Sequence, residues 1–354
     1  MTYPPPRRWH VLTAVGFAIA LTAGAMAPAV AQQSSQPEPV SASGRYDRAF
    51  FDRNMKELSN WGRWGKDDQL GTLNFITPRK RLQAFALART GVVVSMEGPI
   101  VPIPAPPEQA GTDIPQGVST YEIRFRTIPP GDPHHNDGFD GEFERYNPHG
   151  GFTHLDALCH DSDGQGHLYN GYDLASSVSE TTGCRKEGLG ALPQGAIITR
   201  GVLIDMTRLK AAHTAGSPVT VRDIEAWEKQ ARVHVSPGDA LFVYNPGPAM
   251  ANGQPKRGGF DLSVLPWMRA RGVALTSGFY SGSIPGWGGQ VPGVFSADHR
   301  LTLAAMGLPL LDSPNLKPVS EEAARQRRWE FLLIVAPAAM PGSTGALVNP
   351  LAIF

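Results

Sequence analysis

Four histidine and aspartate side chains, of the types that bind divalent metals, fall within one short segment of this sequence, residues 149–160, which reads His-Gly-Gly-Phe-Thr-His-Leu-Asp-Ala-Leu-Cys-His. They are His149, His154, Asp156 and His160. Packing seldom requires so many polar groups beside apolar neighbours, whereas a catalytic metal needs about three protein ligands and an open position. The density of the segment therefore favours a metal site over a structural cluster, and any fold of this chain must bring these groups together.

Local geometry suggests different roles within this segment. His154 and Asp156 are two residues apart, so in an extended strand both side chains point to the same side and can reach one ion. His149 can join them across Gly150–Gly151, where the absence of Cβ atoms lets the backbone fold tightly. If a helix opens at Asp156 or the residue after it, His160 projects about one turn later, placed as a base and not as a ligand.

The N-terminus has the composition of an export signal. Arg7-Arg8 form a small positive region, and Val11–Ala25 is apolar and uncharged. Ala29–Ala31 offers the small-x-small pattern of a signal peptidase site, so we expect cleavage before Gln32. The apolar run is shorter than the roughly 20 residues of a membrane-spanning helix, which disfavours an anchor. Residues 1–31 are therefore interpreted as a signal peptide, and the mature protein is expected to be periplasmic or secreted, without a membrane partner.

The rest of the chain divides into a leader and one domain. Residues 32–44 are small, polar and aperiodic, as in a flexible leader. Residues 45–354 mix strand and helix patterns without a linker or a repeat, which favours a single α/β domain. We expect helices over 79–90, 221–232, 262–271 and 299–306, and strands over 92–96, 121–128, 196–205, 240–244, 273–276 and 331–336. Thr77 is the expected N-cap of the first helix, and Gly201 marks an edge or a bulge.

The charge of the chain limits the classes of partner that we expect, and its two cysteines leave two structural roles open. The chain has 32 basic and 32 acidic residues, so it lacks the positive footprint of a nucleic-acid-binding protein, and we expect a small-molecule substrate. The only cysteines, Cys159 and Cys184, either form a disulfide or are buried as small apolar residues. No C-x-x-C, G-x-S-x-G, H-E-x-x-H, P-loop or G-x-G-x-x-G motif occurs.

The sequence resembles a known family at several places. Its members share the pattern His-x-Gly-Thr-His-x-Asp-x-x-x-His, whose second half matches Thr153–Asp156 with His160. Residues 64–74 (Trp-Gly-Lys-Asp-Asp-Gln-Leu-Gly-Thr-Leu-Asn), 166–171 (Gly-His-Leu-Tyr-Asn-Gly) and 344–350 (Thr-Gly-Ala-Leu-Val-Asn-Pro) resemble further family segments. The chain thus resembles the cyclase family of metal-dependent hydrolases, which includes bacterial kynurenine formamidases and isatin hydrolases.

The resemblance implies a divalent ion, zinc or manganese, held by the first two motif histidines and the aspartate, with the last histidine assisting proton transfer. In this chain these roles fall on His154, Asp156 and His160. The pattern places the first ligand at Gly150, and a one-residue insertion after it would bring His149 into register. His149 is therefore assigned as the first ligand.

The same resemblance implies a second pair of site residues and a fold. His299 and Asp312 occupy the positions at which some members bind a second ion or the substrate; the alternative is that His299 simply begins a helix without a ligand role. The implied fold is a curved, barrel-like mixed sheet with flanking helices, of the swivelling β/β/α type. Members usually form dimers or tetramers, so we expect a homo-oligomer.

The expected activity is hydrolysis of a small amide, N-formyl or cyclic amide bond by a metal-activated water. Two alternatives remain open. One is a metal-dependent cyclase, lyase or lactone hydrolase acting on a polyketide-like substrate. The other is an exported protein that binds a metal–ligand complex without catalysis.

Overall fold

The computed structural model describes residues 46–98, 100–102, 119–121, 123–127, 139–143, 153–192, 195–249, 255–279, 291–338 and 340–354. The predicted signal peptide and leader and His149 lie outside these ranges. Within them, no helix combines the length and apolar character needed to cross a membrane.

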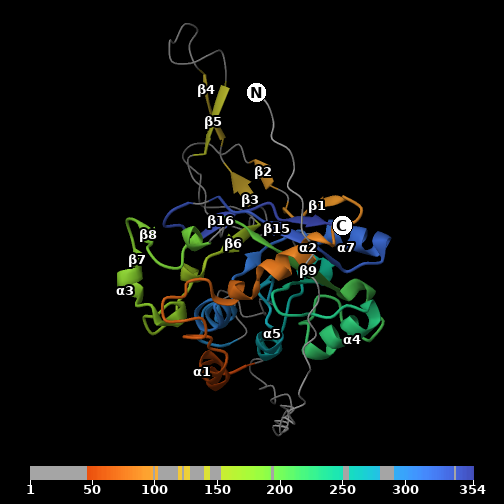
Figure 1. The fold of residues 1–354 in the computed structure, drawn as a ribbon, viewed down its shortest axis with the longest axis horizontal. Helices are drawn as coiled ribbons and strands as arrows, with labels where there is room; N and C mark the ends of the chain where they lie inside the picture. Colours follow the sequence, from red (N-terminus) through yellow and green to blue (C-terminus); the bar gives the residue numbers. More distant parts are fainter. Residues whose placement is uncertain are drawn as a thin grey trace, which may run out of the picture. The chain divides into compact units, whose positions relative to one another are not determined.

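The described part contains short strands and helices mixed along the chain (Figure 1). The helices are α1 (Arg48–Glu57), α2 (Pro78–Phe85), α3 (Leu174–Ser177), α4 (Val221–Ala231), α5 (Leu265–Arg271), α6 (Ala297–His299) and α7 (Lys317–Gln326). Shorter helical turns are η1 (Gly71–Phe75), η2 (Leu158–His160), η3 (Tyr169–Gly171), η4 (Leu189–Ala191), η5 (Met206–Arg208) and η6 (Leu262–Val264), and η7 (Arg300–Met306) is a π-helix.

The strands form one large sheet and several small ones. The large sheet contains β1 (Val93–Ser95), β17 (Leu351–Ile353), β15 (Glu330–Val335), β9 (Ile197–Asp205), β10 (Ala240–Tyr244) and β13 (Leu275–Thr276). A three-stranded sheet contains β14 (Leu311–Asp312), β6 (His154–Asp156) and β16 (Gly345–Leu347). Two-stranded pairs are β2 (Ile100–Pro102) with β3 (Ser119–Tyr121), β4 (Ile123–Thr127) with β5 (Phe139–Phe143), β7 (Val178–Ser179) with β8 (Gly183–Cys184), and β11 (Pro246–Ala249) with β12 (Pro255–Arg257).

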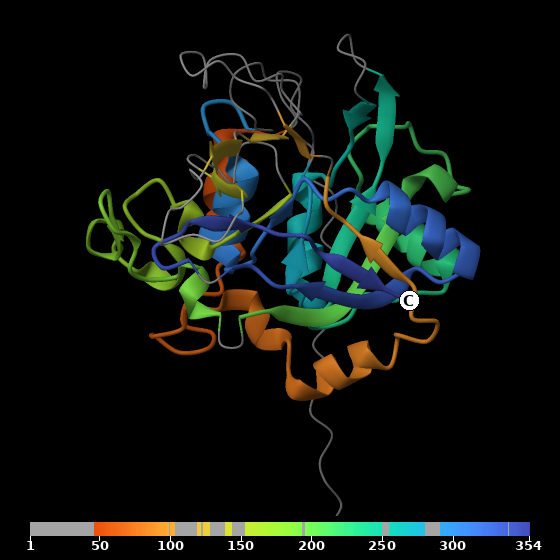
Figure 2. The ribbon, with the colours of Figure 1, turned by 90° about the horizontal axis from the view of Figure 1, so that it is seen from above.

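The six-stranded sheet is mixed and open. Its order is β1-β17-β15-β9-β10-β13; β9, β10 and β13 are parallel, and the other pairs are antiparallel. Figure 2 shows the orange edge strand β1 beside the dark blue C-terminal strands. Closure would require the edge strands β1 and β13 to join the two ends of the sheet. In the described residues they do not pair, so the α/β class with a mixed sheet and flanking helices is confirmed, but the barrel-like shape is not.

Alternate residues of the central strands enter two hydrophobic clusters. On β9, Val202 and Ile204 belong to one cluster and Leu203 to the other; on β10, Leu241 and Phe242 divide in the same way. This two-residue period buries both faces of the sheet, as expected for strands covered on both sides. Helices α1, α4 and α5 contribute to the cluster of Val202 and lie together on one side of the strands (Figure 1).

The first predicted helix begins where expected and ends early. Thr77 is the N-cap of α2, and its side chain accepts from the Lys80 backbone N–H at 3.1 Å. The helix was predicted to continue to residue 90, but it ends at Phe85 and is followed by a tighter turn in which the Leu87 N–H donates to Ala84. Its apolar Leu82 is 71% exposed and faces solvent, whereas Ala84 is buried. Packing of the helix against the large sheet determines which of its sides is buried.

Gly201 was expected to mark an edge or a bulge, and this prediction is wrong. It lies in the middle of β9, which pairs continuously with β15 and β10. Its cross-strand partner is Phe331, and a Cβ atom built on Gly201 would approach the Phe331 ring to 2.2 Å. The glycine is therefore required because an aromatic ring covers its backbone, in the manner of aromatic residues that cover strand glycines.

We predict that Gly201→Ala destabilises the protein by about 1–3 kcal/mol, because the added methyl must displace the Phe331 ring in a packed core. The free energy of unfolding from urea titration measures this. Gly190→Ala is the matched control, since its Cβ would meet nothing within 4 Å. Equal stability of the two variants would contradict the explanation.

The two cysteines form a disulfide. Cys159, at the centre of η2, is bonded to Cys184 in β8, and the two Cα atoms are 6.3 Å apart. Both residues are also buried, at 4% and 8% exposure. The sequence left pairing and burial as alternatives, and the structure shows both together.

Candidate metal centre

Strand β6 carries the centre of the motif and is held on both sides. It pairs antiparallel with β14 and with β16, and His154 lies directly opposite Asp312 on β14. The motif threonine, Thr153, fixes the start of the strand: its hydroxyl donates to the Ser313 carbonyl at 2.9 Å and accepts from the Gly98 N–H at 2.8 Å. Cross-strand neighbours share a face of a sheet, so His154 and Asp312 are brought together by strand register.

The expected pairing of His154 with Asp156 is present. Both belong to the extended strand β6, and His154 Nε2 lies 3.3 Å from Asp156 Oδ1. Their exposed fractions are 5% and 1%. The two-residue spacing therefore places both side chains on one side of the strand, in a largely dehydrated position.

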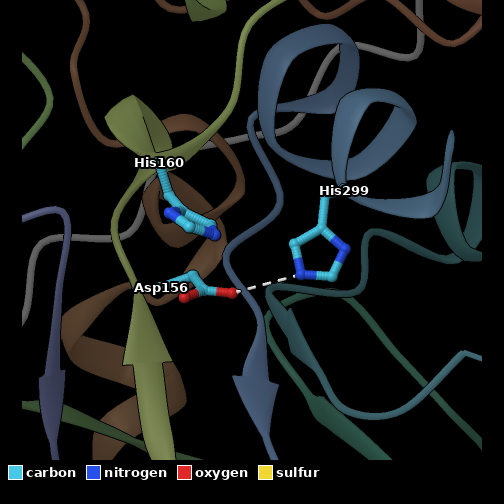
Figure 3. Close-up of side chains that lie close together, drawn as sticks. All are labelled: Asp156, His160 and His299. Atoms are coloured by element: carbon cyan, nitrogen blue, oxygen red, sulfur yellow. Dashed lines mark ion pairs between the residues drawn. The ribbon is translucent and has the colours of Figure 1, made fainter. Parts of the chain in front are cut away.

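His160 follows one turn later. Ala157 is the N-cap of η2, a single 3₁₀ turn that ends at His160. The His160 ring lies edge-on to the His299 ring, with centroids 5.8 Å apart. Figure 3 shows the Asp156, His160 and His299 side chains pointing toward one another from β6, the turn after it and helix α6. The expected helical turn after the strand is thus confirmed as 3₁₀ geometry.

His299 contacts both carboxylates of the site. Its Nε2 lies 3.6 Å from Asp156 Oδ2 and 3.5 Å from Asp312 Oδ2, and its side chain is 19% exposed. The contact with Asp156 is drawn as a dashed line in Figure 3. His299 ends α6 and is followed by the π-helix η7, a type of turn often found at functional sites. His299 and Asp312 therefore lie in the same cluster as the motif residues.

Burial and nearby carboxylates shift the pKa of the His299 ring. Burial favours the neutral ring, but the Asp298 carboxylate, 3.3 Å from Nδ1, and then Asp312 favour the charged ring. The net result raises the pKa of His299 well above its usual value. In the absence of a metal, the neighbouring carboxylates therefore favour the protonated ring, whose positive charge offsets theirs.

Two groups of side chains have the chemistry of a metal site. Asp156, His160 and His299 offer ligand atoms within 4.8 Å of one another, and so do His154, Asp156 and Asp312. Imidazole nitrogens and carboxylate oxygens together suit zinc and other first-row divalent ions. Asp156 is common to both groups, so the donors fit one or two divalent ions around its carboxylate.

A small cavity of about 20 Å³ adjoins the site, and its lining includes Asp156 and Glu187. This volume is sufficient for about one water molecule. A larger cleft of about 550 Å³ shares Glu187 in its lining, together with Asp67, Asp68 and Cys184 among others. Glu187 lies at the boundary between the two spaces.

Glu187 is a buried carboxyl group that the sequence analysis missed. It is 2% exposed, and neither side-chain oxygen makes a hydrogen bond to the described residues. Burial and then the neighbouring Asp68 raise its pKa to about 9, despite the opposing effect of the Tyr169 backbone N–H. The Asp68 carboxylate accepts hydrogen bonds from protein donors, including the Tyr169 hydroxyl at 3.0 Å and the Asn74 amide at 2.8 Å. No local pattern marks Glu187, since its burial results from packing between distant segments.

Asp298 and Asp161 were also missed. Asp298 pairs with His299, and Asp161 lies 3.8 Å from the Arg300 guanidinium. Both are adjacent in sequence to a predicted site histidine. The triplet Asp298-His299-Arg300 was a usable signal, because carboxylates beside a site histidine often orient its ring.

The described residues form an α/β protein with a cluster of histidines and carboxylates that could hold a metal ion, and comparisons with known proteins agree with this class. The family model described as "Putative cyclase" matches residues 99–277, and the chain belongs to this cyclase family. A search of curated proteins found no match.

Solved structures show the likeness in three dimensions. A protein described as a novel cyclase is 24% identical, with a TM-score of 0.67, over 85% of this chain and 99% of that one. An isatin hydrolase bound to the product analogue thioisatinate is 17% identical, with a TM-score of 0.49, over 78% and 99% of the two chains. Isatin hydrolase A from Ralstonia solanacearum is 16% identical, with a TM-score of 0.47, over 78% and 97%. The first of these shows that the fold is shared.

We predict that Glu187 makes the protein less stable as pH rises. In the unfolded chain this carboxyl ionises near 4.5, whereas the folded protein retains the proton up to about 9. Between these values the folded state binds more protons, so the free energy of unfolding falls with pH, by at most about 1.4 kcal/mol per unit. Glu187→Gln, which stays neutral, should flatten this slope.

The measurement is chemical denaturation of both proteins at several pH values between about 5 and 9. Glu180→Gln is the control, because Glu180 is exposed. Parallel stability curves for the wild type and Glu187→Gln would show that Glu187 is not a buried neutral acid.

Proposed function

We propose that this protein is a metal-dependent hydrolase that cleaves a small amide, N-formyl or cyclic amide bond. The observation that carries the proposal is the buried Asp156 carboxylate, with His154 at 3.3 Å and His299 at 3.6 Å. The His160 ring faces this group from the following turn. Membership of the cyclase family and the described activities of its isatin hydrolase neighbours agree with the proposal.

His154 and Asp156 are the proposed metal ligands, and His149, outside the described residues, is the proposed third ligand. The metal is zinc or manganese. When bound, such an ion lowers the pKa of a coordinated water molecule and polarises the substrate carbonyl. His299 and Asp312 lie beside these residues, and we propose that they bind a second ion or hold the polar end of the substrate.

His160 is the proposed general base. An imidazole ring has one nitrogen that accepts a proton and one that donates, which suits a general base in hydrolysis. His160 accepts the proton of the attacking water and returns a proton to the departing nitrogen. Asp156 is buried and Asp312 is partly buried, and electrostatic interactions are stronger where protein replaces water around such groups.

We also propose that the protein is exported and acts outside the cytoplasm as a homo-oligomer. The Cys159–Cys184 disulfide supports export, because structural disulfides persist in oxidising compartments. N-terminal sequencing of the protein recovered from the periplasm or medium should begin at Gln32. Recovery of the full-length chain from the cytoplasm would contradict the export proposal.

Substitution of single histidines tests the metal assignment. We predict that His154→Ala loses both the bound metal and the activity, because one direct ligand is removed. His160→Ala should keep the metal and lose about 10²–10⁴-fold in kcat, the usual contribution of a general base. Elemental analysis and steady-state kinetics of the same preparations measure both quantities.

His234→Ala is the matched control, since His234 is exposed and belongs to neither group of candidate ligands. Full turnover by either test variant would refute the assignment of that residue. Loss of metal from His160→Ala would make His160 a ligand and leave the base unassigned.

The substrate class is tested with N-formylkynurenine, isatin and simple lactones. We predict hydrolysis of at least one of the first two, with loss of turnover after chelation and recovery on adding zinc or manganese. Activity on lactones alone would favour the lactone hydrolase alternative. Tight binding of a metal–ligand complex without turnover would favour a binding protein.

A further inference from the structure

The backbone that carries His160 is a short helical turn with little stability of its own. η2 is a single 3₁₀ turn without a side-chain cap, closed by the His160 N–H donating to the Ala157 carbonyl at 3.0 Å. A helical turn of this length is not stable by itself. The position of His160 therefore depends on what surrounds the turn.

One side of the turn is fixed by the sheet. β6 leads directly into it, and the Ala157 N–H donates to the Thr344 carbonyl at 2.9 Å, just before β16. These contacts hold the start of the turn, but they end before His160.

The other side is fixed by the disulfide. Cys159, immediately before His160, is bonded to Cys184, and its N–H donates to the Glu187 carbonyl at 3.3 Å. Cys184 is itself anchored, because its N–H donates to the Gly342 carbonyl at 2.9 Å. The neighbouring Gly183 packs so closely that a Cβ atom there would lie 2.0 Å from the Gly342 oxygen.

Together with the pairing of β16 and β6, these contacts connect both ends of the turn through neighbouring segments. The chain from Gly342 continues into β16, β16 pairs with β6, and β6 leads back to the turn. The disulfide is the covalent link among these segments and adjoins His160 directly. On the far side of His160, Asp161 lies 3.8 Å from Arg300, the residue after His299.

We propose that the Cys159–Cys184 disulfide positions the ring of His160 against His299 and Asp156, and that it acts on proton transfer and not on metal retention. This inference rests on the proposed function of His160. The expected consequence is selective: without the bond, His160 moves relative to the reacting bond while His154 and Asp156 stay on β6. Misplacement of a catalytic group by about 1 Å can slow a reaction by about a hundred-fold.

The test compares the wild type with Cys159→Ala/Cys184→Ala as full-length, metal-loaded proteins. We expect kcat to fall about ten- to a hundred-fold, with KM and metal content unchanged. A kcat equal to the wild type would overturn the proposal. Loss of metal in step with activity would overturn it as well, because the bond would then support the whole site.

Gly201→Ala is the control for general instability. It weakens the large sheet at a residue outside both groups of candidate ligands and should leave kcat unchanged. If the double variant fails to fold, the wild type is reduced with a phosphine and then reoxidised. Cys184 is among the residues that line the outer cleft, and mass spectrometry checks that reduction of the bond is complete. Reversible loss and recovery of kcat supports the proposal, and unaltered kcat after complete reduction overturns it.

A second readout separates this inference from the proposed function. Carbethoxylation of His160, mapped by mass spectrometry, measures the accessibility of its ring without any substrate. Faster modification of His160 in the reduced protein, with exposed His234 unchanged, supports positioning even if no tested compound is hydrolysed. Equal rates at His160 before and after reduction overturn positioning whatever the enzyme hydrolyses.

Discussion

The buried carboxylate of Asp156 is the group on which the arrangement of the site depends. Its side chain is 0% exposed, and removing an ionised carboxylate from water costs several kcal/mol unless partners replace the solvent. His154 supplies one partner from the same strand and His299 supplies another from α6. His299 also contacts Asp312, so segments far apart in the sequence must assemble before this charge is compensated. A divalent ion beside two carboxylates would complete the same balance.

The half of the site that is local in sequence could be predicted from the sequence. The positions of His154 and Asp156 follow from the two-residue period of a strand, and His160 follows from one turn of helix. These relations need no knowledge of the rest of the fold. The assignment of His149 depends on a loop register that the spacing leaves open, and His149 lies outside the described residues, so its role remains a prediction.

The other half depends on tertiary structure, and local patterns were a poor guide to it. His299 and Asp312 were named from the family resemblance alone, and register on β14 and the contacts of α6 bring them to the centre. Gly201 looked like a bulge because the sequence does not show that Phe331 covers it. The barrel-like shape and the buried Glu187 likewise depend on how distant strands and loops meet, which periodicity does not encode.

The disulfide links two proposals, export of the protein and proton transfer by His160. A base carried on one 3₁₀ turn can adjust easily, yet proton transfer requires a distance held within a fraction of an ångström. The Cys159–Cys184 bond offers covalent support beside His160, but only where thiols stay oxidised. The compartment predicted from residues 1–31 is of this kind. Export and positioning of His160 are therefore mutually consistent proposals: an oxidising location permits the bond, and the bond allows a single short turn to carry the base.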